Sequence, residues 1–169
     1  MLAYGAGDAG AFETLYARHR GGLFRFVLRA VKDRGAAEEL FQEVWVRVIE
    51  ARERYAPKAR FITWLYTIAH NLLVDHWRKK GLSLVALDGD EVPSESANPA
   101  RQAEAREALA RLVQALESLP AAQREAFLLH EEGGLSVAQI AAATGVGEEA
   151  AKSRLRYAMT KLKAAVDDG

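Results

Sequence analysis

Five basic side chains and no acidic one lie in the short segment KSRLRYAMTKLK, residues 152–163. The whole chain balances 23 Lys and Arg against 23 Asp and Glu, so its net charge is zero. Arginine can read guanine edges in the major groove of DNA, and lysine or serine can hold a phosphate. A local basic segment in a neutral chain therefore indicates a contact with nucleic acid. The alternative is an ordinary solvated face of a helix.

Aromatic and basic side chains are mixed in a second segment, YAPKARFITWLYTIAHNLLVDHWRKK, residues 55–80. Unstacked bases pack on aromatic rings while cations follow the backbone, so this mixture suits single-stranded nucleic acid. Phe61 and Trp64 lie at helical spacing, which favours a place in a core for both. Tyr55 lies beside a proline and off that stripe, so it is the stronger candidate for contact with a base.

Histidine and carboxylate residues raise the question of metal or hydrolytic chemistry. His70 and His76 are six residues apart, which places them on different faces of a helix and not on the shared face that a metal needs. His130 has no second histidine four residues later. The chain also lacks cysteine, a phosphate-binding glycine loop and a nucleophile elbow. We therefore expect no metal, no cofactor and no enzymatic activity.

The elements that must position these side chains are helices. Apolar residues recur at helical spacing in the first half, at Ala37, Leu40, Phe41, Val44 and Val48, and again at Phe61, Leu65, Ile68 and Leu72. An earlier helical stretch, 12–27, could be broken at Gly21 and Gly22. In the second half a helix is marked by Leu109, Leu112, Val113 and Leu116, and Pro120 can open the next one.

The composition divides the chain into two helical domains, 1–80 and 104–169. Between them, residues 81–103 collect glycine, serine and proline and carry one basic against four acidic residues, which is typical of a linker. The run SLVAL in this linker is the one strand-like stretch. The predicted fold class is all-α. No signal peptide or membrane span is apparent, so we expect an intracellular, cytoplasmic protein without membrane insertion.

A helix-turn-helix is predicted in the second domain. Ser136 and Gln139 have the spacing of a capping box, and Gly145 can end the helix that they open. The next helix begins after Gly147, with two glutamates in its first turn. Two helices joined by a short turn with glycine form this motif. Its second helix would bury Ala151, Leu155, Ala158 and Leu162.

Taken in order, these segments resemble the extracytoplasmic-function (group 4) sigma factors of bacterial RNA polymerase. FETLYARHR is similar to the start of their region 2, and AAEELFQEVWVRV to the segment that docks on the polymerase clamp. FITWLYTIAHNLLVDHWRKK resembles the helix pair that melts and reads the minus-ten promoter element. The segment from LPAAQREAF to KSRLRYA resembles region 4, which reads the minus-thirty-five element.

The resemblance implies a sigma factor whose partners are core RNA polymerase, promoter DNA (duplex and melted strand) and an anti-sigma factor. It implies that the polymerase is bound by Glu38, Glu39, Leu40, Gln42, Glu43 and Trp45. It implies that DNA is bound by Tyr55, Lys58, Arg60, Trp64, Asn71, Arg78, Lys79, Lys152, Ser153, Arg154, Arg156 and Tyr157. Asn71 would read a flipped base together with Tyr55 and the Pro57–Ala59 loop, because an amide offers donors and an acceptor to a base edge. An ordinary surface asparagine is the alternative.

Two other classes of protein remain possible from the residues alone. A stand-alone helix-turn-helix regulator would bind duplex DNA unaided, but it has no need of the aromatic and basic segment or of an acidic docking face. An adaptor that binds only proteins has no need of the basic segment 152–163.

Overall fold

The structure, a computed structural model, describes residues 1–81 and 101–167, except for the side chains of 101–106. Within these ranges it contains helices and no strand, so the all-α prediction is confirmed. The run SLVAL and most of the predicted linker lie outside the described residues. The first half holds α1 (Leu2–Gly5), α2 (Ala9–Val31), α3 (Arg34–Glu50) and α4 (Phe61–Lys79). The second half holds α5 (Arg101–Glu117), α6 (Ala121–Glu131), α7 (Val137–Thr144) and α8 (Glu148–Asp167).

Aspartate caps set where α2 and α3 begin. The carboxylate of Asp8 accepts a hydrogen bond from the backbone N–H of Ala11, and that of Asp33 accepts one from Ala36, at 3.2 and 2.7 Å. These caps satisfy backbone donors that a helix leaves free in its first turn. Helix α2 runs without a break through Gly21 and Gly22, so the predicted interruption there is wrong.

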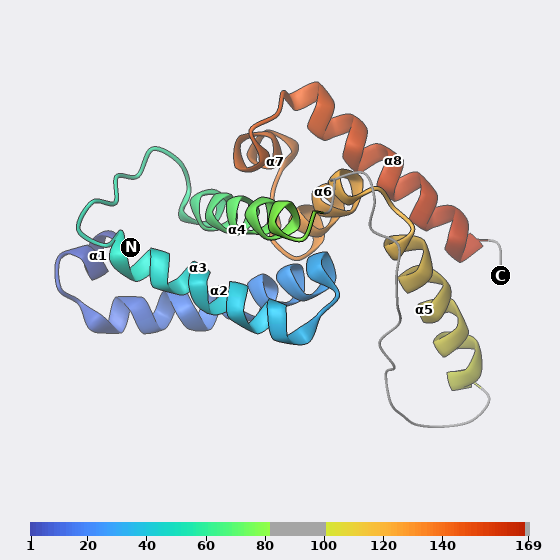
Figure 1. The fold of residues 1–169 in the computed structure, drawn as a ribbon, viewed down its shortest axis with the longest axis horizontal. Helices are drawn as coiled ribbons and strands as arrows, with labels where there is room; N and C mark the ends of the chain where they lie inside the picture. Colours follow the sequence, from blue (N-terminus) through green and yellow to red (C-terminus); the bar gives the residue numbers. More distant parts are fainter. Residues whose placement is uncertain (82–100, 168–169) are drawn as a thin grey trace.

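The helices are arranged around α4. Figure 1 shows α4 between the pair α2 and α3 on one side and α6 with α7 on the other, while α8 runs along the outside and α5 extends away. Helix α5 packs on α8, which ties it to the second half. Helix α4, with seven buried residues, thus has neighbours in both halves of the chain.

One apolar core extends through both halves. Its fully buried members include Leu23 and Phe26 of α2, Leu65 of α4, and Leu128 of α6. A smaller cluster, formed by Leu119, Ala158 and Leu162, joins α8 to the turn before α6. Burial of apolar side chains is the dominant favourable term in folding, so the two predicted domains also stabilise each other in this arrangement.

Candidate nucleic-acid interface

The predicted helix-turn-helix is formed by α7 and α8. The Ser136 hydroxyl accepts from the backbone N–H of Gln139 at 3.3 Å, and the Gln139 side chain accepts from the backbone N–H of Ser136 at 2.9 Å. Both halves of the capping box are therefore present. Gly145 ends α7 at φ 68°, in the left-handed region that favours glycine. These features confirm the turn that the sequence predicts.

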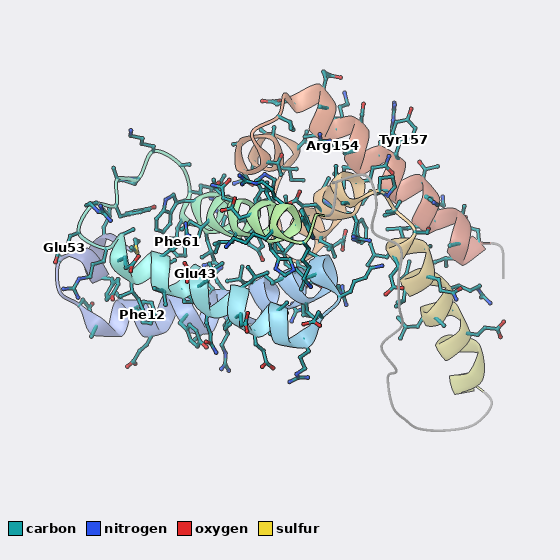
Figure 2. The ribbon with its side chains drawn as sticks, in the orientation of Figure 1. Phe12, Glu43, Glu53, Phe61, Arg154 and Tyr157 are labelled. Carbon is teal, nitrogen blue, oxygen red and sulfur yellow. The ribbon has the colours of Figure 1, made fainter. Side chains whose placement is uncertain are left out.

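One face of α8 is buried, and the rest of the helix is exposed or half-buried. The buried side chains are the predicted Ala151, Leu155, Ala158 and Leu162. On the rest of the helix Lys152, Arg156 and Tyr157 are exposed, and Ser153 and Arg154 are half-buried. Figure 2 labels Arg154 and Tyr157 on this helix. All five predicted contacts thus lie on one helix, outside its buried face.

Two of the basic side chains on α8 make contacts within the protein. The guanidinium of Arg156 lies 5.4 Å from the centre of the Tyr157 ring, a distance that suits a cation–π contact. Lys161 donates to the backbone carbonyl of Ser118 at 3.4 Å, so this cation is directed at the turn between α5 and α6. Within the basic segment, Arg156 therefore lies on the outer face of α8, while Lys161 helps α8 to pack against the second half of the chain.

A second candidate surface lies where the loop after α3 meets the start of α4. The ring of Tyr55 contacts that of Trp64, with centroids 4.9 Å apart, and that of Phe61 at 6.4 Å. The ring of His19, from α2, lies 5.4 Å from Phe61. All four side chains are only partly buried. Burial lowers the pKa of His19, with a smaller contribution from the cation of Arg18, and burial raises the pKa of Tyr55.

The predicted DNA contacts on α4 share one face. Trp64, Asn71 and Arg78 are seven residues apart in turn, which is two turns of a helix, so they lie one above another. Asn71 and Arg78 are exposed, and Arg78 pairs with Asp75. Lys58, Arg60 and Lys79 are exposed at the two ends of this face. The structure therefore brings aromatic, amide and basic groups together along one side of α4.

The predicted docking residues lie on α3. Glu38, Glu39 and Gln42 are exposed, while Glu43 and Leu40 are half-buried. Ion pairs of 3.0 Å join Glu38 to Arg34 and Glu43 to Arg47. A hollow of about 510 Å³ opens between α3 and α4, and Figure 2 labels Glu43 on its α3 side. The hollow is lined by Ala36, Glu39, Leu40, Glu43, Arg47, Leu72, Asp75, His76 and Lys79.

Trp45 does not fit the predicted docking role. Its residue is 5 % exposed, and its ring packs against those of Tyr16 and Phe12, at 5.0 and 5.8 Å between centroids. The resemblance assigned Trp45 to docking, and the apolar stripe was taken as Ala37, Leu40, Phe41, Val44 and Val48, although Trp45 lies four residues after Phe41 and so on the same side of the helix. The aromatic residues of α2 extend the buried face of α3 far enough to include it.

Polar contacts between the two halves were not predicted. The Glu132 carboxylate, after α6, accepts from Arg25 and Arg29 of α2, at 2.6 Å each. His70, on α4, lies 2.6 Å from a Glu125 carboxylate oxygen. The Tyr66 hydroxyl donates to the backbone carbonyl of Glu132 at 3.3 Å. These pairs are separated by 55 to 107 residues, so no local pattern could have found them.

The described ranges contain no candidate metal centre and no helix that could span a membrane. Residues 1–81 and 101–167 contain no group of three histidine, cysteine or acidic residues placed to hold a metal ion. Among the helices of those same ranges, none is both long and apolar enough to cross a membrane.

The described part of the chain is helical and contains a helix-turn-helix, a motif that many DNA-binding proteins use. The family model described as "Sigma-70 region 2" matches residues 15–82, and the one described as "Sigma-70, region 4" matches residues 109–162. The chain is 36 % identical to RNA polymerase sigma factor CarQ of Myxococcus xanthus, an alignment that covers 96 % of this chain and 93 % of CarQ. It is 33 % identical to ECF RNA polymerase sigma factor SigL of Mycobacterium tuberculosis, over 94 % of this chain and 90 % of SigL.

The chain belongs to the sigma-70 family, among the extracytoplasmic-function (ECF) sigma factors of RNA polymerase. Its fold is also similar to that of the sigma factor RpoE from Bartonella quintana, solved in complex with the anti-sigma factor NepR. That comparison has a TM-score of 0.74 and 22 % identity, and it covers 93 % of this chain and 97 % of RpoE.

Proposed function

We propose that this sigma factor is a non-catalytic subunit that directs core RNA polymerase to promoters in the cytoplasm and helps to open them. In this proposal α3 docks on the polymerase, α4 with its preceding loop reads the melted minus-ten strand, and α8 reads the minus-thirty-five element. The observation that carries the proposal is the shared face of Trp64, Asn71 and Arg78 beside Tyr55, in a chain that also has a helix-turn-helix.

Each group on that face has a separate task. Aromatic rings can stack on an unpaired base, which contributes about 1–3 kcal/mol per base. The amide of Asn71 can then read the edge of a base that has left the stack. Lys58, Arg60, Arg78 and Lys79 can follow the backbone of the strand. A protein that binds only duplex DNA has no use for this combination.

Docking on α3 is proposed for Glu38, Glu39, Leu40, Gln42 and Glu43, without Trp45. Complementary charge chiefly sets the rate and specificity of association, so an acidic face suits a basic partner surface. The hollow between α3 and α4 is lined by the acidic residues Glu39, Glu43 and Asp75, and also by the cations of Arg47 and Lys79. The relative RpoE is solved with an anti-sigma factor, and we extend control by an anti-sigma factor to this chain.

The test separates this function from that of a stand-alone regulator. Affinity for DNA depends strongly on phosphate neutralisation, and the second half has no excess of positive charge, with 8 basic and 10 acidic residues from position 104 on. We therefore expect weak promoter binding by the free chain. With core polymerase, both halves are held at their elements, and effective concentration multiplies their affinities.

The measurement is a gel-shift titration on duplex promoter DNA at physiological salt, with and without core polymerase. Tight binding is expected only when the polymerase is present. Nanomolar, sequence-specific binding by the free chain, unchanged by polymerase, would instead identify a regulator.

A further inference from the structure

Tyr157 lies on the side of α8 that faces away from the rest of the protein. The buried residues of this helix form one stripe, made of Ala151, Leu155, Ala158 and Leu162. Each residue of a helix is turned by about 100° from the one before it, so Tyr157 lies roughly 135° from the centre of the stripe. With an exposed fraction of 57 %, Tyr157 is the most exposed of the large apolar residues on α8.

The other residues of this outward face are polar. They recur three or four positions apart, and they are Glu149, Ser153, Arg156 and Thr160. The hydroxyl of Thr160 donates to the backbone carbonyl of Arg156 at 2.9 Å, so its hydrogen is used within the helix. The ring of Tyr157 is therefore the one large apolar surface on this face of α8.

The ring of Tyr157 is held by its neighbour. The guanidinium of Arg156 lies 5.4 Å from the centre of the ring, and a cation–π contact at this distance keeps the two side chains together. A side chain that is already held loses less conformational freedom when it meets a ligand. Tyrosine also offers a large contact area with few rotatable bonds. The ring is thus prepared for a contact with a shaped surface.

The major groove of DNA limits what such a ring can recognise. Guanine, adenine and cytosine present only hydrogen-bond donors and acceptors there, while thymine also presents its 5-methyl group. An apolar ring gains free energy when it covers an apolar group and removes it from water. An exposed ring in the middle of the outward face of α8 therefore matches thymine.

The spacing along α8 gives Tyr157 a base pair of its own. A recognition helix places its N-terminal residues at base edges in the major groove. Tyr157 follows Ser153 by one turn, which is about 6 Å along the helix axis. Base pairs are stacked about 3.4 Å apart, so contacts one turn apart fall about two base pairs apart. Tyr157 therefore meets a base pair further along the groove than the one that Ser153 meets.

We propose that Tyr157 reads the 5-methyl group of one thymine in the minus-thirty-five element. The proposal rests on the proposed function, because it assigns a base to one residue of the helix that is proposed to read this element. Arg156 acts on the ring as a positioning residue. A contact of the Tyr157 hydroxyl with a phosphate is the competing role, and it would carry no sequence information.

The test combines changes in the DNA with changes in the protein. Holoenzyme, assembled from the wild-type chain and core polymerase, first selects duplexes from a promoter library that is randomised over the minus-thirty-five region. Each thymine of a selected site is then replaced singly by uracil, which removes only the methyl group. Loss of one buried methyl contact corresponds to about fourfold in affinity. We expect this weakening for uracil at one position, measured by competition with the unmodified duplex.

The protein variants separate the ring of Tyr157 from its hydroxyl. Tyr157→Ala should bind the thymine and uracil duplexes equally at that position, and alanine favours the helix, so the fold should be kept. Tyr157→Phe retains the ring and should keep the fourfold preference that we expect of the wild type, about 0.8 kcal/mol. Val166→Ala is the matched control, because Val166 is an exposed apolar residue about 13 Å further along α8. It should keep the preference, and circular dichroism checks the helix content of all three variants.

A preference for thymine over uracil that persists unchanged in Tyr157→Ala would overturn the assignment. Equal binding of both bases by the wild type at every position would do the same, while leaving duplex reading by α8 in place. Loss of the preference in Tyr157→Phe would identify a contact through the hydroxyl and would overturn reading of the methyl group. If the wild-type holoenzyme enriches no sequence from the library, the proposed function of α8 fails, and the role of Tyr157 fails with it.

Discussion

The ring of Tyr55 meets the ring of Trp64 nearly edge-on, with centroids 4.9 Å apart and an angle of 67° between the planes. This contact joins the loop after α3 to the first turns of α4. It places a half-exposed ring next to the face that carries Asn71, for which contact with a melted base is proposed.

Removal of the Tyr55 ring should impair promoter opening more than closed-complex formation. Tyr55→Ala removes a stacking surface for a base that is met only after the strands part, a loss of about 1–3 kcal/mol. Tyr55→Phe retains the ring and should open the promoter almost normally. Permanganate reactivity of unpaired thymines reports opening, and a gel shift reports binding. Equal opening by the alanine variant and wild type would remove Tyr55 from the site.

Reversal of charge on α3 should abolish polymerase binding. Glu39→Lys with Glu43→Lys changes two residues outside the core, and the new lysine beside Arg47 should cost only a few tenths of a kcal/mol in stability. Co-purification with core polymerase is the measurement. Glu50→Lys with Glu53→Lys, an equal charge change at the last residue of α3 and in the turn after it, is the control and should leave binding intact. Retained binding by the first pair would exclude the acidic docking face.

Arginine and lysine on α8 should differ in what they contribute. Arg154→Ala should reduce discrimination at one base pair of the minus-thirty-five element by about 1–3 kcal/mol, because arginine can read a guanine edge. Lys152→Ala should weaken all sequences equally, because a phosphate contact carries no sequence information. Competition between promoter variants for the polymerase-bound sigma factor separates the two effects. Uniform weakening by Arg154→Ala would contradict the major-groove assignment.

His19 should titrate below its ordinary pKa of 6.5. Burial is the larger cause and the cation of Arg18 the smaller, so Arg18→Gln should raise the pKa only in part. Because the folded state disfavours the charged ring, the contribution of His19 to stability is present at neutral pH and is lost as pH falls through its folded pKa. The C2 proton shift in an NMR titration gives the midpoint. A midpoint at or above 6.5 would contradict this.

The local structure of this protein could be predicted from its sequence. The capping box of Ser136 and Gln139, the left-handed Gly145 and the buried stripe of α8 follow from rules that involve residues only a few positions apart. The same rules predict that α8 presents its cations outward. The rules failed at Gly21 and Gly22, which they interpret as a break in the helix. Gly22 instead lies against the backbone of Glu132, a contact with a residue too distant in sequence for these rules to include.

Tertiary packing alone decided the rest. Trp45 is buried because aromatic side chains from α2 cover it, and Gly22 is needed because the backbone of Glu132 passes beside it. Glu132 forms ion pairs with Arg25 and Arg29, which are more than 100 residues away in the sequence. Hydrophobic periodicity predicts which face of a helix is buried, but it does not predict which other helix covers that face. The order of residues thus fixes the helices and which of their faces are apolar, while the three-dimensional packing determines how the two halves contact each other.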